Sequence, residues 1–358
     1  MSRFFADQYK DLTPYVPGEQ PQDKKYIKLN TNESPFEPPE SVKNAVSGQA
    51  DTARLYSDPD LTALRAQMAQ NYGIPADNIV MSNGSDEILN LAFMAFADEK
   101  KPLAFADITY GFYKVIAELN SIPYTVIPLK EDFSIRADDY VGLGKTIVIA
   151  NPNAPTGLYL ELSKIERILK SNPENVVIVD EAYIDFGGES AVCLVKKYDN
   201  LIVTGTFSKS RSLAGARLGF AFANQKLIAD INALRYSMNP YNVNCFTSAA
   251  GIAALKEKSY FDNNCKVIIE NRDFLEAELK SLGFIVIPSS ANFVFAKTSL
   301  IGGKELYLRL KEKGILIRHF DNDRIKDYNR ITVGTAKQMK TLIEKIKEVL
   351  EEIENEKC

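Results

Sequence analysis

Residues 206–220 hold the side chains best suited to covalent chemistry. Lys209 follows a short apolar stretch, lies among the hydroxyls of Thr206 and Ser208, and is followed eight positions later by Arg217. A lysine amine can form an imine with an aldehyde. Hydroxyls and a guanidinium together suit a phosphate monoester. An aldehyde and a phosphate on one ligand describe pyridoxal phosphate, and the alternative is a loop that merely carries surface lysine and arginine.

A carboxylate follows another apolar run, Val176-Val177-Ile178-Val179. Asp180 is placed at the mouth of a buried strand, where an unpaired charge is costly. A protonated pyridine nitrogen would be a useful partner, because it keeps the ring an electron sink. Tyr183 and Asn153 could each donate a hydrogen bond to the ring's phenolic oxygen. The alternatives for Asp180 are a helix N-cap and a structural salt bridge.

The turn Asn83-Gly84-Ser85-Asp86-Glu87 joins a predicted strand to a predicted helix. Its small residues would expose backbone N–H groups at a helix N-terminus, which is a ready anion site, and Ser85 is a plausible N-cap. We include Asp86 among the cofactor-binding residues. Tyr110, beyond the next apolar run, could stack on the cofactor ring or belong to the core.

The composition narrows the mechanisms. His319 is the only histidine, so triads and zinc sites built on several imidazoles are disfavoured, and the proton carrier should be Lys, Tyr or a carboxylate. Four cysteines (Cys193, Cys245, Cys265 and Cys358) show no metal-ligand spacing, so no metal is expected. The net charge of −4 gives no reason to expect nucleic acid or a membrane. No signal core is seen, and we expect a cytoplasmic protein.

The elements that must position these residues alternate along the chain. Short apolar runs at 78–81, 102–106, 146–150, 176–179 and 201–203 are separated by stretches with helical spacing, such as 85–93 and 163–170. This alternation predicts an α/β fold with a mostly parallel sheet flanked by helices. Ligands bind beyond the carboxyl ends of such strands, and that is where the polar clusters fall.

The C-terminal part has another pattern, with strands predicted at 284–287, 292–296, 315–318 and 330–333 and a final amphipathic helix over 336–352. We expect a smaller α+β domain. The predicted division is a large cofactor-binding domain over 43–245, with 1–42 plus 246–358 forming the small domain and N-terminal arm.

In this order, the motifs SNGSDE, NPNAPTG, VDEAY, TFSKS and ARLGF resemble those of fold-type I, aspartate-aminotransferase-like pyridoxal enzymes, and within them the histidinol-phosphate aminotransferase family. The resemblance runs from the segment LNTNESP at 29–35 to RITVGT at 330–335. It implies a homodimer with shared active sites that moves an amino group from L-histidinol phosphate to 2-oxoglutarate in histidine biosynthesis.

The same resemblance implies a role for each residue. Lys209 would be the Schiff-base lysine and proton shuttle, with Asp180 on the pyridine nitrogen. Tyr183 and Asn153 would contact the phenolic oxygen, and Tyr110 would stack on the ring. The phosphate would be held by Gly84, Ser85, Thr206, Ser208, Arg217 and, from the neighbouring subunit, Tyr56.

Substrate recognition would fall mainly to two arginines. Arg330 would clamp a substrate carboxylate and Arg318 would bind the distal phosphate, with Asn32 also contacting substrate. The alternative for each arginine is a structural ion pair. Rival functions are an aminotransferase for aromatic or other amino acids, a phosphothreonine-type decarboxylase, and a regulatory module without turnover. Residues 11–28 are expected to close over the substrate.

Overall fold

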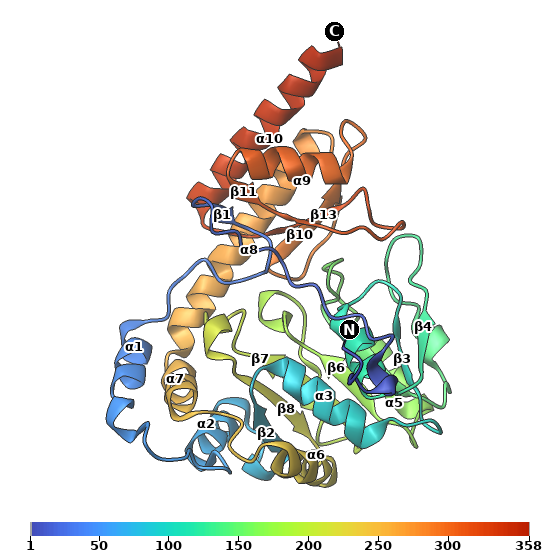
Figure 1. The fold of residues 1–358 in the computed structure, drawn as a ribbon, viewed down its shortest axis with the longest axis vertical. Coiled ribbons are helices and arrows are strands. Elements are labelled where there is room, and N and C mark those ends of the chain that lie inside the picture. Colours follow the sequence, from blue (N-terminus) through green and yellow to red (C-terminus); the bar gives the residue numbers. More distant parts are fainter. Residues whose placement is uncertain (1, 358) are drawn as a thin grey trace.

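The computed structural model describes residues 2–357, so Cys358 lies outside the described part of the chain. A seven-stranded mixed sheet and a smaller four-stranded antiparallel sheet lie in two separate parts of the molecule (Figure 1). The pair β1 (Ile27–Lys28) and β11 (Ile315–Leu316) ties the N-terminal segment to the smaller part. The predicted fold class, a large α/β unit with a smaller α+β unit, is confirmed.

The large sheet has the strand order β2-β8-β7-β6-β5-β3-β4. Its strands are β2 (Ile79–Ser82), β3 (Leu103–Ala106), β4 (Tyr124–Ile127), β5 (Thr146–Ala150), β6 (Val177–Asp180), β7 (Leu201–Thr206) and β8 (Gly219–Ala223). The pairs from β4 to β7 are parallel, whereas β8 is antiparallel to both β7 and β2. Every residue of β5, β6 and β7 is buried, which explains their continuous apolar sequences.

Helices cover both faces of this sheet. Along β5, Ile147 and Ile149 join one hydrophobic cluster, and Val148 and Ala150 join the other, because successive side chains point to opposite faces. The first cluster is covered by α2 (Thr62–Tyr72), α5 (Leu162–Ser171) and α7 (Cys245–Lys256), and α1 (Glu40–Ser47) packs on α7. The second is covered by α3 (Ser85–Phe96), α4 (Phe112–Leu119) and α6 (Gln225–Met238).

The strand directions bring the polar clusters to one edge. The carboxyl ends of the parallel strands meet there, which places Asp180 and the loop after Thr206 side by side. Because β8 runs the other way, its first residue, Gly219, lies at the same edge and pairs with both Thr206 and Ser82. Arg217 is therefore delivered to this edge by the start of a strand.

The smaller part is built on the order β12-β13-β10-β9. Its elements are α8 (Lys258–Ser281), β9 (Ile285–Ile287), β10 (Phe293–Lys297), α9 (Gly303–Glu312), β12 (Arg318–His319), β13 (Asn329–Thr332) and α10 (Ala336–Lys357). Short 3-10 helices complete the chain: η1 (Asp7–Tyr9), η2 (Ala50–Thr52), η3 (Ala76–Asn78), η4 (Ala137–Tyr140), η5 (Ile184–Phe186), η6 (Ala191–Leu194) and η7 (Ala214–Ala216).

The hydrophobic cores show how the two parts are connected. Ala250, Leu255 and Phe261 belong to the core of the large sheet, whereas Cys265 and Ile268, about one and two turns further along α8, belong to the core of the small part. The change of core thus falls inside α8. The domain boundary at residue 245 stays a prediction, and this packing favours a boundary later in the chain, inside α8.

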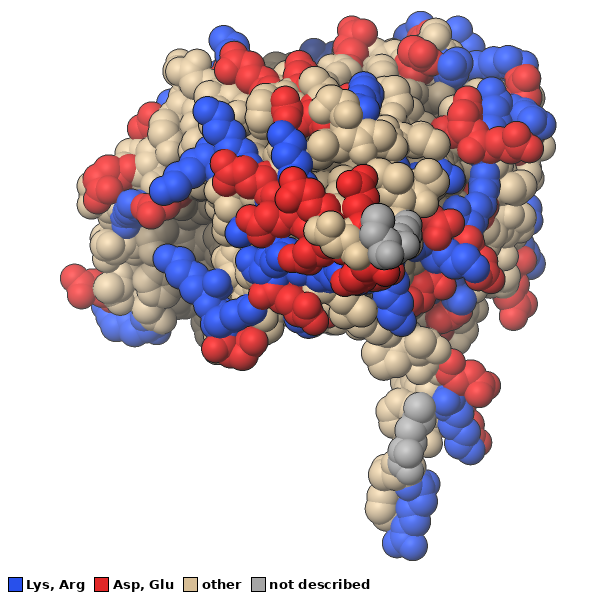
Figure 2. Space-filling view, turned by 90° about the horizontal axis from the view of Figure 1, so that it is seen from above, with Lys and Arg blue, Asp and Glu red and all other residues tan. Residues whose placement is uncertain are grey.

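Acidic and basic side chains are intermixed on the face of the molecule shown in Figure 2. Ion pairs join α9 to α10, for example Arg309 with Glu356 at 2.7 Å and Lys313 with Glu352 at 2.6 Å. Such exposed pairs contribute little to stability individually. Among residues 2–357, no helix is both long and apolar enough to span a membrane.

Candidate active site

A cavity of about 410 Å³ opens at the carboxyl edge of the large sheet. The predicted site residues that line it are Ser85, Asp86, Tyr110, Asp180, Tyr183, Thr206, Ser208, Lys209 and Arg217. They come from the ends of β6 and β7 and the loops that follow them, from the start of α3 and from the loop before α4. Arg217 lies two residues before β8. The fold thus brings together most of the cofactor residues expected from the sequence.

One end of the cavity is a cradle for an anion. Arg217 Nη2 lies 3.0 Å from Asp86 Oδ2, and Tyr110 Oη donates to Asp86 Oδ1 at 2.9 Å. Gly84 has φ of +80°, and a Cβ on it would lie 2.5 Å from Arg217 Nη2. Arg217 is itself left-handed, with φ of +56°. The guanidinium is therefore held close to the N-terminus of α3, where backbone N–H groups favour negative charge.

The predicted cap of α3 was wrong in one detail. The N-cap is Gly84, whose positive φ a serine would adopt only with strain, and Ser85 is the first helical residue. Ser85 lines the cavity, and no side chain caps the helix.

The carboxylate of Asp180 is buried and neutralised by no cation. It accepts hydrogen bonds from Tyr113 Oη at 2.7 Å and Thr204 Oγ1 at 3.1 Å, and the described residues place no basic side chain within ion-pair distance. Burial raises the pKa of Asp180, although the two hydroxyl donors oppose that shift. Neither the N-cap nor the salt-bridge alternative applies. Tyr113, in the first turn of α4, was missed in the sequence, although it follows Tyr110 by three positions.

Lys209 reaches across the cavity to the N-terminal segment. Its Nζ donates to the carbonyl oxygen of Thr31 at 3.1 Å and lies 5.8 Å from the ring centre of Tyr183. Asn153 is buried, and its side-chain amide donates to Ile108 O and to Thr156 Oγ1. Its predicted contact with the phenolic oxygen stays a prediction.

A second cavity of about 320 Å³ adjoins the first and shares Tyr183, Lys209 and Arg217 with it. Arg318 and Arg330 line it and are direct cross-strand partners on β12 and β13. Like charges in such positions repel. Neither guanidinium has a carboxylate within ion-pair distance among residues 2–357, so the structural ion-pair alternatives are not seen. Arg330 donates to Asn30 O at 2.9 Å, and Arg318 only to the carbonyls of the N-terminal arm at 3.3 Å.

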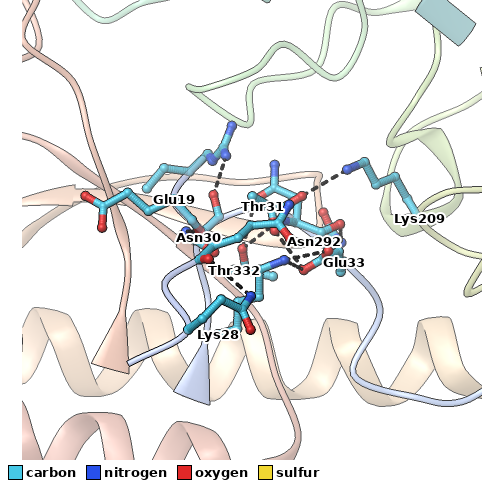
Figure 3. A network of polar contacts seen from close by, with 12 residues as sticks. Glu19, Lys28, Asn30, Thr31, Glu33, Lys209, Asn292 and Thr332 are labelled. Carbon is cyan, nitrogen blue, oxygen red and sulfur yellow. Dashed lines mark hydrogen bonds and ion pairs between the residues drawn. The ribbon is translucent and has the colours of Figure 1, made fainter. Parts of the chain in front are cut away.

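A polar network links the N-terminal segment to Lys209, Asn292 and Thr332 (Figure 3). Thr31 Oγ1 donates to Glu33, which also accepts from Lys28, and Asn32 Nδ2 donates to Tyr183 Oη at 3.0 Å. Further along the arm, Tyr15, Pro17 and Gly18 line the second cavity and Gln20 lines the first. In the sequence, the motif LNTNESP pointed to the segment that holds Thr31, Asn32 and Glu33. A motif alone does not show where any of its side chains is directed.

Tyr56 lies away from both cavities. Its side chain is 83% exposed and stacks on Tyr241 with ring centres 4.4 Å apart. Within the described chain it therefore does not contribute to its own site.

These residues fit pyridoxal phosphate. The cradle at Gly84 and Arg217 suits the phosphate, the unpaired buried carboxylate of Asp180 suits a protonated ring nitrogen, and Lys209 supplies the amine between them. Fold and cavity together define a fold-type I pyridoxal-phosphate enzyme.

Comparison with known proteins supports this assignment. Residues 24–346 match the sequence model of the family described as aminotransferase class I and II. A histidinol-phosphate aminotransferase of Brachyspira hyodysenteriae is 48% identical over 98% of this chain and 99% of its own length. The histidinol-phosphate aminotransferase of Clostridium acetobutylicum is 46% identical over 98% of this chain and 100% of its own length. The chain belongs to the class I and II aminotransferases, and within them to the histidinol-phosphate aminotransferase family.

Solved structures show the same fold. The histidinol-phosphate aminotransferase structure from Clostridium acetobutylicum has a TM-score of 0.84 and 26% identity, covering 91% of this chain and 99% of that one. The protein from Sinorhizobium meliloti, solved in complex with pyridoxal-5'-phosphate, also gives a TM-score of 0.84, at 23% identity and 92% coverage of both chains. Family membership and the site residues together make the chain a pyridoxal-phosphate-dependent aminotransferase.

Proposed function

We propose that this enzyme transfers the amino group of L-histidinol phosphate to 2-oxoglutarate, in the biosynthesis of histidine. The observation that carries the proposal is the pair Arg318 and Arg330, which line the cavity beside Lys209 and have no carboxylate partner within residues 2–357. Histidinol phosphate has a phosphate and no carboxylate, whereas glutamate has carboxylates and no phosphate. Two guanidiniums can serve these anions in turn, with Arg318 on the phosphate and Arg330 on the carboxylate.

Bound pyridoxal phosphate supplies an aldehyde carbon for the amine and a ring that accepts electron density. The chain's residues do the rest. Arg217, Ser85, Thr206 and Ser208 bind the phosphate, and Asp180 keeps a proton on the ring nitrogen. Lys209 Nζ accepts the proton that leaves the α-carbon of the amino donor.

The amino-donor half-reaction tests the substrate assignment. Holoenzyme is mixed with L-histidinol phosphate or L-glutamate without keto acid, and the absorbance change of the cofactor is followed. Replacing Arg318 with Gln should lower kcat/KM for histidinol phosphate roughly ten- to hundredfold, since charge-assisted hydrogen bonds are lost, and affect glutamate less. Arg330→Gln, its matched control, should show the opposite preference.

Other outcomes would change the assignment. A holoenzyme that responds to phenylalanine or tyrosine but not to histidinol phosphate would be an aromatic aminotransferase of the same fold. Release of CO₂ from a phosphorylated amino acid without any keto acid would indicate a decarboxylase. Binding of cofactor without response to any amine would support a module that has lost turnover.

We also propose that the enzyme is a cytoplasmic homodimer in which Tyr56 reaches the partner's phosphate site. Tyr56 and Tyr241 form an exposed aromatic pair, and Leu55, Tyr236 and Met238 are exposed as well. Large apolar side chains exposed together favour a protein interface. Sedimentation of the holoenzyme should give about twice the chain mass, and Tyr56→Phe should weaken cofactor binding; a monomer with full activity would contradict this.

A further inference from the structure

Asn32 is fixed by hydrogen bonds to other parts of the protein. It is buried, and its backbone is left-handed, with φ of +56°, a conformation that Asn adopts more readily than other residues with a side chain. Asn292 Nδ2 donates to its carbonyl oxygen at 3.0 Å, and its own N–H donates to Thr332 Oγ1 at 2.9 Å. Every polar group of Asn32 thus has a partner within the protein.

These contacts fix the direction of each hydrogen bond. Thr332 Oγ1 accepts from the N–H of Asn32, and its single hydroxyl hydrogen is then donated to Asn32 Oδ1 at 3.0 Å. Because that side of the amide accepts, the other side is the NH₂ group, which donates to Tyr183 Oη at 3.0 Å. The hydroxyl of Tyr183 therefore acts as an acceptor toward Asn32, and its own hydrogen is left for a partner in the cavity.

We infer that Asn32 and Thr332 are positioning residues that orient the Tyr183 hydroxyl so that it donates its hydrogen into the cofactor cavity. Tyr183 lines both cavities, beside Lys209. The inference rests on the proposed cofactor site and on the contact between Tyr183 and the phenolic oxygen that was predicted from the sequence. A donated hydrogen bond stabilises that oxygen as an anion. Asn32 then acts on the cofactor through Tyr183 and need not touch the substrate.

The substitution Asn32→Asp tests this with little change of shape. A carboxylate can only accept, so it would draw the Tyr183 hydrogen away from the cavity. Without that donor, more negative charge stays on the phenolic oxygen and the neighbouring imine nitrogen holds its proton more firmly. The pH midpoint of the holoenzyme's long-wavelength absorbance band, titrated without substrate, should rise by roughly one unit.

A double-mutant cycle separates orientation from the added charge. Tyr183→Phe alone should also raise the midpoint, and in that background Asn32→Asp should add only the smaller shift caused by its charge. The other charged and titratable groups around Tyr183 (Lys209, Tyr15, Tyr110, Tyr113 and Arg330) are the same in all four proteins. Thr332→Val, which adds no charge, should shift the midpoint in the same direction by a smaller amount.

Two results would overturn the inference: no shift in an Asn32→Asp enzyme that binds cofactor and unfolds at the temperature of the parent, or an equal shift with and without the Tyr183 hydroxyl. The titration uses no substrate, so it succeeds or fails separately from the histidinol phosphate assignment. Absence of the band in the parent enzyme would instead contradict the cofactor site itself.

Discussion

Replacing Lys209 with Ala should lower kcat by roughly 10⁴-fold or more, because one amine is both the covalent anchor of the cofactor and the proton carrier. No other lysine lines the cavity among the described residues, so no neighbour can take over. The cofactor should still bind, since the cradle at Arg217 and the carboxylate of Asp180 remain. Single-turnover absorbance with the amino donor, together with a cofactor-binding titration, measures both effects.

A small added amine provides the control for this variant. Methylamine can occupy the space left by the lysine side chain and accept the proton, so partial recovery of the half-reaction is expected with Lys209→Ala. Lys145→Ala, which removes a lysine bonded to Thr125 away from the cavity, should leave turnover unchanged. Retention of appreciable turnover by Lys209→Ala without added amine would refute the assignment.

Asp180→Asn should lower kcat by about 10²–10³-fold and at the same time stabilise the apoenzyme at neutral pH. The amide cannot stabilise a proton on the ring nitrogen, which accounts for the loss of activity. The stability effect follows from burial, which raises the pKa of Asp180. A carboxyl group with a raised pKa holds its proton more tightly in the folded chain, so its contribution to stability falls as pH rises above about 4.

Thermal unfolding of the two apoenzymes across pH measures this. The midpoint of Asp180→Asn should exceed that of the parent at pH 7, and the difference should shrink as pH falls toward 4. Tyr113 and Thr204 can still bond the amide, because hydroxyls both donate and accept. Asp77 is an exposed carboxylate paired with Arg65. The control substitution Asp77→Asn should therefore neither lower kcat nor stabilise the apoenzyme at neutral pH. An apoenzyme destabilised at neutral pH by Asp180→Asn would contradict the proposed origin of the raised pKa.

Much of the fold was accessible from the sequence, because burial on both faces leaves a direct trace. The apolar runs at 146–150, 176–179 and 201–203 correspond to β5, β6 and β7. The strands β4 and β8 were not predicted. β4 lies at an edge with Val126 exposed, so its apolar pattern is incomplete. β8 is fully buried, but three of its five residues are Gly or Ala, which conceals its strand character.

The site was predicted where a residue directly follows a strand and missed where it depends on packing between distant segments. Lys209 and Asp180 could be placed from their strands alone. Tyr113 bonds Asp180 across 67 positions, and Thr31 meets Lys209 across 178, and neither pairing leaves a periodic signal. The register that sets Arg318 opposite Arg330 likewise depends on the turn between β12 and β13.

The left-handed backbone at Arg217 would make the abundance of this enzyme depend on the supply of pyridoxal phosphate. Such a conformation costs on the order of 1–3 kcal/mol, and the half-exposed pair with Asp86 offsets at most about 1 kcal/mol of it. A bound phosphate would offset the remainder, and cofactor at a hundredfold excess over its Kd would stabilise the fold by about 2.7 kcal/mol. Chains without cofactor would therefore open more often and be degraded first. A cell short of pyridoxal phosphate would lose the protein as well as its activity.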